Sequence, residues 1–428
     1  MTILAEVRSV EPSTSGLDIR QTIAALRAGG DEAVIAAAEA IAPAIAERAD
    51  YHDRTGIFPT RNFEELWASG LTSLSLPASA GGVGASLYAT SRALGLVAKA
   101  DGSTAFLLKW HLTRFRDAAS KWPEPVRSDV LREILSGPAL IAGLRVEPEL
   151  GSPARGGTPG TRAKLVVGPN GEKKWRISGH KIYGSGSVAV RWFAVWGATL
   201  EEDGPVRVGS FLVPAGTPGV EIIEGSWDQI GMRATASNDI VFHDVEIPYE
   251  NAIGLLPFQG ADPLSARRKE SAVADWGSVL EASLYAGIAD ATRDWLVVYL
   301  NKRAPASLGA PLSHLERFQL AVGEIELLTY ANRQLIDSVS RRIDAQSAGE
   351  TSLEQEVTGN ETAMVKVAAV RNAIAAVDLA VSLVGNPGLA YRHPVQRYYR
   401  DVLHGRVHEP QADTILLATG RQALGLGA

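Results

Sequence analysis

The sequence predicts an α+β fold in which a central antiparallel β-domain lies between two helical regions. Residues 18–137 carry apolar residues at helical spacing, whereas residues 138–256 change to short runs of β-branched and aromatic residues. Residues 257–428 return to long helical patterns. This helical–β–helical order is unusual for one chain and narrows the choice of fold. Residues 1–17 contain Glu, Ser, Pro, Thr and Gly and predict a poorly ordered tail.

The N-terminal region predicts helices joined by a glycine-rich loop. Residues 35–47 are rich in alanine at helical spacing, and Asn62 is a residue type that caps the start of a helix. A further helical pattern covers residues 87–100. Residues 77–85 contain Gly-Gly-Val-Gly but lack the preceding βαβ pattern and downstream acid of a dinucleotide loop. We therefore interpret them as a packing turn.

The central region carries the residue patterns of strands, whereas the C-terminal region carries those of helices. Short runs typical of strands, separated by Gly, Pro, Asn and Asp, occupy residues 190–197, 206–213 and 239–247. Residues 149–174 are dense in Gly, Pro, Arg and Lys and predict an exposed, mobile loop. Patterns with the length and periodicity of bundle helices cover residues 276–300, 313–345 and 354–384.

Composition excludes several classes of function. A chain of 428 residues exceeds one ordinary core and predicts two or three domains. The net charge of -6 argues against nucleic acid as a main partner, because phosphate binding needs a basic surface. The sequence has no cysteine, which excludes disulfides, thiolate catalysis and cysteine-ligated metals or iron–sulfur clusters. Redox chemistry would therefore need an organic cofactor or a metal without thiolate ligands.

The sequence also predicts a protein that is not embedded in a membrane. No run approaches the roughly 18 uninterrupted apolar residues that span a bilayer. The N-terminal residues lack a basic start followed by an apolar stretch, the pattern of a secretory signal. We therefore expect a cytoplasmic location.

The segment most informative about chemistry is residues 397–411. It places one carboxylate, Glu409, beside His408 and after an arginine-rich aromatic stretch that includes Arg400 and His404. A carboxylate in such surroundings can be held as a proton acceptor or anchored as an ion pair. Structural ion pairs outnumber catalytic carboxylates, so the segment alone favours the ion pair.

Motifs elsewhere in the chain bear on the choice between an ion pair and a catalytic carboxylate. In order they read Leu-Pro-Ala-Ser-Ala-Gly-Gly-Val-Gly (76–84), Val-Glu-Pro-Glu-Leu-Gly-Ser (146–152), Trp-Arg-Ile-Ser-Gly-His-Lys-Ile-Tyr-Gly-Ser (175–185), Ile-Gly-Met-Arg-Ala-Thr-Ala-Ser (230–237), Phe-His-Asp-Val-Glu-Ile-Pro (242–248) and Val-Gly-Asn-Pro-Gly-Leu (384–389). Together with Arg-Tyr-Tyr-Arg-Asp at 397–401, they resemble the acyl-CoA dehydrogenase superfamily over nearly the whole chain after the tail.

The resemblance implies an architecture, a cofactor and an assembly. It implies an N-terminal helical domain, a central β-barrel-like domain and a C-terminal four-helix bundle. Family members usually bind FAD between the β-domain and the bundle and assemble as homodimers or homotetramers. The resemblance also implies a small-molecule substrate, an acyl thioester, and an electron-transfer or flavin-reductase partner.

The resemblance assigns the catalytic role to Glu409. In the family's dehydrogenases a glutamate removes the α-proton of an acyl thioester while hydride leaves the β-carbon for flavin N5. Such a base works when burial brings its pKa close to that of the substrate. The family's aromatic-Glu-Gly-Thr motif aligns with residues 407–411 and places Glu409 at the base position. Pro410 replaces the usual glycine, which biases Glu409 towards an extended backbone and removes one donor.

The resemblance places four residues beside the flavin ring. Tyr183 would pack on the ring where the dehydrogenases commonly carry tryptophan, and Ser185 would donate a hydrogen bond near N5. Val146 stands where the family's threonine would contact the flavin. Ser152 follows a glycine in a loop suited to approach a phosphate or a thioester. An ordinary Tyr/Ser pair on a strand and a surface Ser/Gly loop are the alternative interpretations.

Three further residues are expected at the far part of the cofactor. Arg303 ends a helical pattern where the family places a pyrophosphate-binding arginine, a role that suits the guanidinium fork. Gly385 and Gly388 would let the backbone approach the cofactor of a neighbouring subunit. A helix C-cap is the alternative for these two glycines.

Other functions remain open alongside the dehydrogenase. Residues 181–186 and 233–237 also resemble flavin-dependent monooxygenases of the dibenzothiophene-desulfurisation type, whose late His-Asp-Pro motif is similar to residues 408–410. Those enzymes take reduced flavin from a partner and oxygenate in a dry pocket, and FMN is then possible. A flavin-binding scaffold that has lost its base is a third reading. A metal site at His404 and His408 is not expected, because no third ligand is evident.

Overall fold

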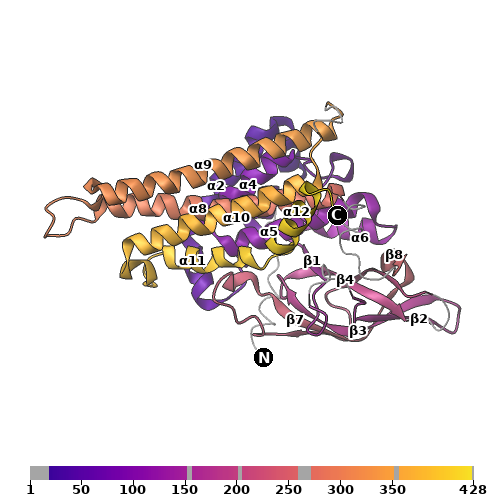
Figure 1. Cartoon of the computed structure of the whole chain (residues 1–428). Coiled ribbons are helices and arrows are strands. Elements are labelled where there is room, and N and C mark those ends of the chain that lie inside the picture. Colours follow the sequence, from indigo (N-terminus) through magenta and orange to yellow (C-terminus); the bar gives the residue numbers. More distant parts are fainter. Residues whose placement is uncertain (1–18, 152–156, 201–204, 259–270, 351–355, 427–428) are drawn as a thin grey trace.

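Helices make up one side of the molecule and a single sheet makes up the other (Figure 1). The computed structural model describes residues 19–151, 157–200, 205–258, 271–350 and 356–426. The predicted tail at residues 1–17 lies outside the described residues. Within them the helical–β–helical order that the sequence predicts is confirmed.

Five N-terminal helices pack against the later bundle or against one another. They are α2 (Ile19–Thr55), α3 (Thr60–Ala68), α4 (Leu87–Ala100), α5 (Gly102–Lys121) and α6 (Val126–Ser136). One of them, α5, contacts both α8 (Ser271–Lys302) of the bundle and β1 (Leu140–Leu144) of the sheet. Helix α4 covers the residues predicted for it and is capped by Ser86, whose Oγ accepts the Ala89 N–H at 2.9 Å. The prediction that Asn62 caps a helix is wrong, because α3 begins two residues earlier. Asn62 is buried and instead donates a hydrogen bond to Thr104 Oγ1 at 2.8 Å.

An eight-stranded sheet forms the central part in the order β6-β7-β3-β2-β4-β5-β8, with β1 paired to β4. The strands are β1 (Leu140–Leu144), β2 (Arg162–Val167), β3 (Lys173–Gly184), β4 (Val190–Leu200), β5 (Arg207–Pro214), β6 (Val220–Ile223), β7 (Asn238–Pro248) and β8 (Ala252–Pro257). The strands expected from the sequence are confirmed as β4, β5 and β7, whereas the loop expected over residues 149–174 is wrong in part, because β2 and the first residues of β3 lie within it. Within the described residues β6 and β8 do not pair, so the sheet is barrel-like without closing.

Two pairings differ from the expected antiparallel arrangement. Strands β1 and β2 both run parallel to β4, while the other ladders are antiparallel. Strand β1 pairs with β4 from Val190 to Val195, and β2 pairs with β4 from Ala198 to Leu200. The chain therefore leaves the sheet after β1 and re-enters it in the same direction. Local residue patterns do not encode that direction.

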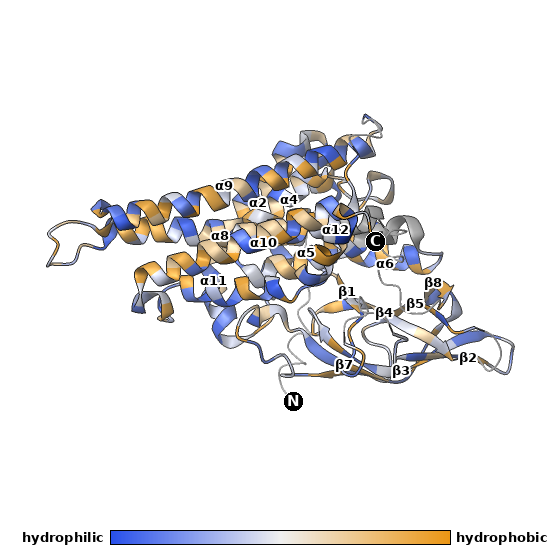
Figure 2. Ribbon diagram, in the orientation of Figure 1, coloured by the Kyte–Doolittle hydropathy of each residue, from blue (hydrophilic) through white to orange (hydrophobic). Residues whose placement is uncertain are grey.

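The C-terminal part is a bundle of long helices. Its helices are α8 (Ser271–Lys302), α9 (Glu316–Ser347), α10 (Gly359–Val384), α11 (Val395–Val402) and α12 (Ala412–Ala423). The three predicted bundle helices are confirmed as α8, α9 and α10. Both hydrophilic and hydrophobic residues occur along α9 and α11, as expected of helices with one face in the core and one outside (Figure 2).

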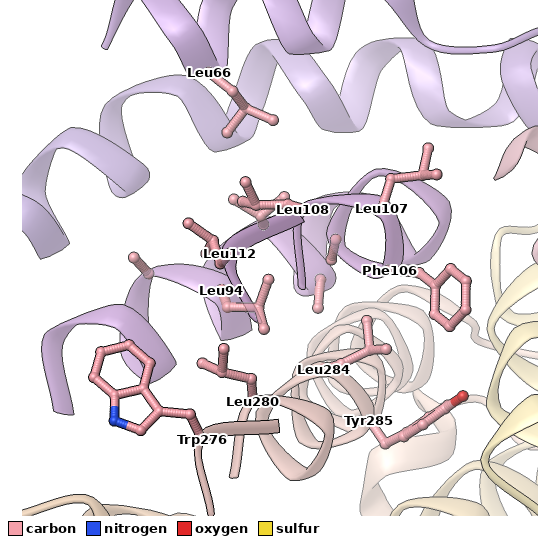
Figure 3. Packing of buried hydrophobic residues seen from close by; sticks show 14 of the residues in the cluster. Leu66, Leu94, Phe106, Leu107, Leu108, Leu112, Trp276, Leu280, Leu284 and Tyr285 are labelled. Atoms are coloured by element: carbon pink, nitrogen blue, oxygen red, sulfur yellow. The ribbon is translucent and has the colours of Figure 1, made fainter. Parts of the chain in front are cut away.

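Helix α8 is the centre of the packing. It contacts α4, α5, α9, α10 and α11, so apolar residues surround most of its circumference. Leu280 and Leu284 of α8 belong to the same core cluster as Leu108 and Leu112 of α5 (Figure 3). Helix α10 is long and apolar enough to cross a bilayer by length and composition alone. In this structure it packs against α8, α9 and α11, and its apolar residues line the core of the bundle.

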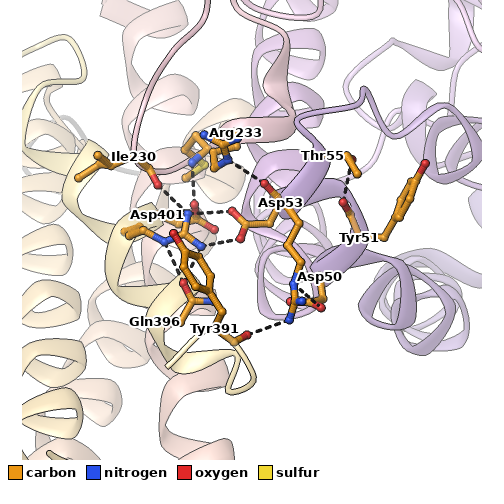
Figure 4. A network of polar contacts seen from close by, with 12 residues as sticks. Asp50, Tyr51, Asp53, Thr55, Ile230, Arg233, Tyr391, Gln396 and Asp401 are labelled. Carbon is orange, nitrogen blue, oxygen red and sulfur yellow. Dashed lines mark hydrogen bonds and ion pairs between the residues drawn. The ribbon is translucent and has the colours of Figure 1, made fainter. Parts of the chain in front are cut away.

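A polar junction holds the sheet against the bundle (Figure 4). Arg400 of α11 donates to Asp53 of α2 at 2.9 Å and to the carbonyl of Ile230 at 2.6 Å. The Met232 N–H donates to Asp401 Oδ1 at 2.6 Å. The junction joins three parts of the chain that are distant in sequence, and it fixes the last strands of the sheet relative to the segment that follows α11.

Candidate functional site

The segment that follows α11 enters the interior between the bundle and the sheet. A short 3-10 turn, η9 (Leu403–Arg406), carries the chain from α11 to His408 and Glu409. Arg400, which the sequence placed near Glu409, turns away and pairs with Asp53. The arginine-rich surroundings of Glu409 therefore do not include the guanidinium of Arg400.

Three charged side chains from three helices meet inside the bundle next to this segment. Glu281 of α8 accepts from Lys109 of α5 at 3.0 Å and is paired with Lys366 of α10 at 2.8 Å. All three side chains are 3% exposed or less. Buried charges are tolerated only when they are paired and hydrogen-bonded, and each helix supplies a partner here.

The cluster holds Glu281 as an anion. Burial by itself raises the pKa of Glu281, but the charges of Lys109, Lys366 and His408 and the hydrogen bond from Lys366 outweigh burial and lower this pKa to about 2. Burial lowers the pKa of the Lys109 ammonium group, and the attraction of Glu281 opposes that change. Glu281 therefore stays ionised at neutral pH and does not serve as a proton acceptor.

Several contacts fix the position of His408 next to the cluster of Glu281, Lys109 and Lys366. Its Nδ1 lies 2.5 Å from the Tyr285 hydroxyl, and its ring stacks on Phe106 with centroids 4.7 Å apart. Phe106 and Tyr285 both face the C-terminal segment (Figure 3). Lys366 Nζ donates to the backbone carbonyls of His408 at 3.1 Å and Pro410 at 3.0 Å. The imidazole thus has a defined position, and its side chain is 15% exposed.

The imidazole is neutral in this environment. Burial is the main cause that lowers the pKa of His408 to about 3, and the attraction of Glu281 opposes it, while Lys109, His404 and Lys366 add to the lowering. Burial raises the pKa of Tyr285 well above its ordinary value. The pair is therefore a neutral phenol hydrogen-bonded to a neutral imidazole, which can donate one hydrogen bond and accept another without carrying charge.

A second group of polar residues lies where β3 ends. The Ser237 hydroxyl donates to Ser185 Oγ at 3.0 Å and lies 2.8 Å from Thr235 Oγ1. The oxygen of Ser185 is thereby an acceptor, and its own proton is available to a bound group. Tyr183 is 53% exposed beside it and has φ of 60°, an uncommon backbone conformation for a tyrosine. A half-exposed aromatic ring next to a hydroxyl group that already accepts one hydrogen bond is a suitable lining for the ring of a flavin.

Aromatic side chains connect this strand end to His408. The ring centroids are 6.2 Å apart for Tyr183 and Trp227, 5.9 Å for Trp227 and His404, and 6.1 Å for His404 and His408. The structure therefore connects Tyr183, through Trp227, to His404 in the segment that contains Glu409. These contacts run through Trp227, a residue that the sequence reasoning did not single out.

The residues predicted from the Val-Glu-Pro motif have mixed outcomes. The carbonyl of Val146 accepts the Ile182 N–H at 3.0 Å, which places Val146 one residue from Tyr183 along the pairing. Glu147 of the same motif is buried, pairs with Lys181 at 2.6 Å and accepts the Thr161 N–H. The ion pair of Glu147 and Lys181 therefore anchors β3 two residues before Tyr183. Ser152 lies outside the described residues.

Arg303, Gly385 and Gly388 lie at a different end of the bundle. Arg303 follows Tyr285 by 18 positions on α8 and its extension, roughly 27 Å along a helix axis. It is exposed and lines a surface hollow with Trp295, Val298, Tyr299 and Lys302. His393, which follows the two glycines, contacts Trp295 with ring centroids 5.7 Å apart. The structure therefore gathers these three residues at one end and leaves them far from His408.

The two glycines have different local roles. Gly385 has φ of 67° and caps α10, donating its N–H to the Val381 carbonyl at 3.2 Å. A Cβ on Gly388 would lie 2.9 Å from the Val381 carbonyl oxygen, so a side chain there would push against the helix end. A C-cap accounts for Gly385, and close packing accounts for Gly388.

Sequence reasoning selected Glu409 and missed the charged cluster. Glu409 is half-buried between two residues whose carbonyls bind Lys366. The missed residues are Lys109, Tyr285, Glu281, Lys366 and Trp227. Single charged residues inside apolar helical runs, such as Glu281 within Val-Leu-Glu-Ala-Ser-Leu, were the available indication. No group of three or more His, Asp or Glu suited to a metal ion occurs in the described part of the chain.

Comparison with known proteins identifies the family. Residues 31–125 match the model of the acyl-CoA dehydrogenase N-terminal domain, and residues 279–411 match the model of the acyl-CoA dehydrogenase C-terminal domain. A putative acyl-CoA dehydrogenase, YdbM of Bacillus subtilis, is 31% identical over 88% of this chain and 92% of its own. The chain belongs to the acyl-CoA dehydrogenase family. It is accordingly a flavin-dependent enzyme of that family, an oxidoreductase.

Other relatives in the family carry different activities in their names. L-evernosamine nitrososynthase from a Micromonospora species is 31% identical over 90% of this acyl-CoA dehydrogenase-family chain and 88% of its own. The structure of KijD3 in complex with FMN and a dTDP-amino-keto sugar has a TM-score of 0.75 at 28% identity, with 93% of this chain and 94% of that chain covered. Family membership therefore settles the fold and the class of cofactor and leaves the reaction open.

Proposed function

We propose that this protein is a flavin-dependent monooxygenase that transfers one oxygen atom from O2 to a nucleophilic heteroatom of a small molecule. The observation that carries the proposal is the neutral pair of His408 and Tyr285 beside the charged cluster. Trp227 and His404 connect the pair to Tyr183, which together with Ser185 is expected to line the flavin ring.

The character of that pair favours oxygen transfer over removal of a carbon-bound proton. An effective base for an α-proton needs a pKa close to that of the substrate. His408 has its pKa lowered to about 3 by burial and is a weak base. The buried carboxylate of Glu281 is held ionised by two lysines. A neutral N–H or O–H donor is instead suited to stabilise negative charge that develops on oxygen.

The chemistry divides between the cofactor and the chain. A reduced flavin would supply two electrons, so that one atom of O2 enters the substrate and the other leaves as water. Tyr183 would offer its exposed face to the ring, and Ser185 would donate its free proton. His408 would donate a hydrogen bond from its exposed edge, and the surrounding apolar residues would exclude water.

The relatives support a substrate class and partners within this proposal. Because nitrososynthases are among the relatives, an amine on a sugar nucleotide is the first substrate to test. FMN is favoured over FAD within this proposal, since KijD3 was solved with FMN and Arg303 lies far from His408. A flavin reductase would supply the reduced cofactor. If FAD is bound, a second copy of the chain would have to bring Arg303 to its pyrophosphate, which favours a homodimer or homotetramer.

Acyl-CoA dehydrogenation remains the second candidate because of one specific observation. Glu409 lies between His408 and Pro410, whose backbone carbonyls both accept hydrogen bonds from Lys366, so the position of its backbone is fixed. A carboxylate on such a segment could reach the α-carbon of an acyl thioester. Substrate would then reduce the flavin directly without O2, and the electrons would pass to an electron-transfer partner.

One experiment distinguishes the two reactions. The purified full chain is loaded with FMN or FAD and mixed with acyl-CoAs under anaerobic conditions, and flavin bleaching is recorded. In parallel, reduced flavin, O2 and amino sugar nucleotides are supplied and products are examined for a mass increase of one oxygen. Oxygenated product without bleaching supports the proposal, whereas bleaching without oxygenated product overturns it.

Matched variants assign the outcome to residues. His408→Phe keeps an aromatic ring but removes the donor, so we expect oxygenation to fall on the order of 100-fold with flavin still bound. Glu409→Gln should leave oxygenation within about three-fold under the monooxygenase proposal and abolish bleaching under the dehydrogenase alternative. His243→Phe is the control, because His243 is an exposed histidine of β7 that pairs with Glu221.

A further inference from the structure

The hydroxyl of Tyr285 contacts one of the two ring nitrogens of His408. Tyr285 is fully buried on α8, and its hydroxyl lies 2.5 Å from His408 Nδ1. The phenol hydroxyl has no other hydrogen-bond partner within the described residues, so its proton is directed to Nδ1 and the phenol is the donor. Nδ1 is therefore the acceptor, and the single ring proton resides on Nε2.

A competing arrangement exists in the same cluster. Glu281 Oε1 lies 3.9 Å from His408 Nδ1, which is too far for a hydrogen bond, but its negative charge would attract a proton on that nitrogen. In that arrangement Nε2 would become an acceptor and the exposed edge of the ring would lose its donor. Tyr285 and Glu281 thus favour opposite tautomers of one histidine.

The groups around His408 oppose a third state, the imidazolium. Glu281 is the charge that attracts a cation here, while Lys109 and Lys366 repel it from α5 and α10. His404 faces the ring at a centroid distance of 6.1 Å and also disfavours a positive charge. Phe106 covers one face of the ring. The choice is therefore between two neutral tautomers.

We propose that Tyr285 is a positioning residue that locks His408 in the Nε2–H tautomer, so that the site presents a hydrogen-bond donor to bound oxygen. The inference deepens the proposed monooxygenase function and rests on it for the role of the donor. The preference for the Nε2–H tautomer itself depends only on residues of the chain and not on flavin or substrate. Lys109 and Lys366 support this tautomer, because Lys366 donates a hydrogen bond to the His408 carbonyl and both lysines form ion pairs with Glu281.

The test measures the tautomer directly. The full chain is labelled with 15N-histidine, and the 15N resonances of its eight histidines are recorded between pH 5 and 8. His408→Gln identifies the signals of His408 by their loss. We expect a pH-independent spectrum with Nε2 in the protonated range and Nδ1 in the unprotonated range. Protonated Nδ1, or a titration within this pH interval, would overturn the proposal.

A variant tests the cause. Tyr285→Phe keeps the ring and removes the hydroxyl, so we expect the proton to move to Nδ1 and towards Glu281. An unchanged tautomer in a folded Tyr285→Phe protein would overturn the role of Tyr285. Tyr330→Phe is the matched control, since Tyr330 is 57% exposed on α9. If Tyr285→Phe does not fold, the wild-type spectrum still decides between the tautomers.

The readout separates this inference from the proposed function. The spectra need neither flavin nor substrate. An Nε2–H tautomer in a protein that forms no oxygenated product would leave the lock standing and refute only the monooxygenase. Oxygenation by a protein whose His408 carries its proton on Nδ1 would refute only the lock.

Discussion

Replacing Glu281 with glutamine should destabilise the protein strongly at neutral pH. The substitution keeps the shape of the side chain but leaves Lys109 and Lys366 as buried ammonium groups without a counter-charge. The lowering of the Glu281 pKa from 4.5 to about 2 corresponds to roughly 3 kcal/mol of folding free energy. Removal of one partner from a buried ion pair costs about 3–5 kcal/mol in general. Both estimates agree on the size of the loss.

The loss should depend on pH in a defined direction. A buried lysine without its partner has a folded pKa below its unfolded value, so the unfolded chain binds more protons and stability rises with pH. We therefore expect the deficit of Glu281→Gln to shrink by up to about 1.4 kcal/mol per pH unit between pH 7 and 9 for each neutral lysine. In the wild type, the contribution of Glu281 is lost only as pH falls from 4.5 towards about 2.

Urea unfolding followed by tryptophan fluorescence measures these differences through the midpoint at an unchanged slope. Glu326→Gln is the control, because Glu326 pairs with Arg293 at the surface and should change stability by less than about 1 kcal/mol. The combined variant Lys109→Met, Glu281→Leu, Lys366→Met removes all three charges and should recover most of the loss. A Glu281→Gln protein within about 1 kcal/mol of the wild type at pH 7 would refute this reasoning.

The junction of Figure 4 gives three further predictions for the same unfolding assay. Arg400→Ala leaves Asp53, which is 5% exposed, without its counter-charge and should cost about 3–5 kcal/mol, with Arg400→Lys intermediate; a loss below about 1 kcal/mol would contradict this. Burial raises the pKa of Asp401 to about 7, so its stabilising contribution is complete below pH 3.8 and is lost as pH rises through about 7. Asp401→Asn should remove this dependence and become more stable than the wild type at pH 8, and equal pH profiles would refute it. Gly231→Ala places a Cβ 2.3 Å from the Arg400 carbonyl oxygen and should cost about 1–3 kcal/mol, so a neutral effect would contradict the close approach.

Hydrophobic periodicity made the long helices predictable, but it does not indicate the direction in which a strand runs. The residues of α4 and the three bundle helices follow directly from apolar spacing over many turns. The parallel pairing of β1 and β2 with β4 depends on how a long connection returns the chain to the sheet. Asn62 shows the limit of local rules, because its amide is recruited by Thr104 in the tertiary structure.

The candidate site was predictable only in part, for a related reason. Tyr183 and Ser185 stand in a motif that is contiguous in sequence, and the structure places them at an exposed strand end. The cluster of Glu281 with its lysines assembles from α5, α8 and α10, whose residues are up to 257 positions apart, as Lys109 and Lys366 are. A lone charge in an apolar helix indicates that a partner exists but not which residue it is.

The charge balance of the interior bears on which substrate the site can accept. Lys109 and Lys366 both pair with Glu281 in the cluster, and Lys109, Lys366 and His404 oppose a positive charge on His408. At low effective dielectric the same groups would oppose a cation bound at His408. Under the proposed oxygen transfer, an amine would therefore enter in its neutral form, the form whose nitrogen lone pair can attack oxygen. The neutral His408 would then offer a hydrogen bond to the oxygen that is transferred, so electrostatics and hydrogen bonding around His408 are both compatible with the proposed chemistry.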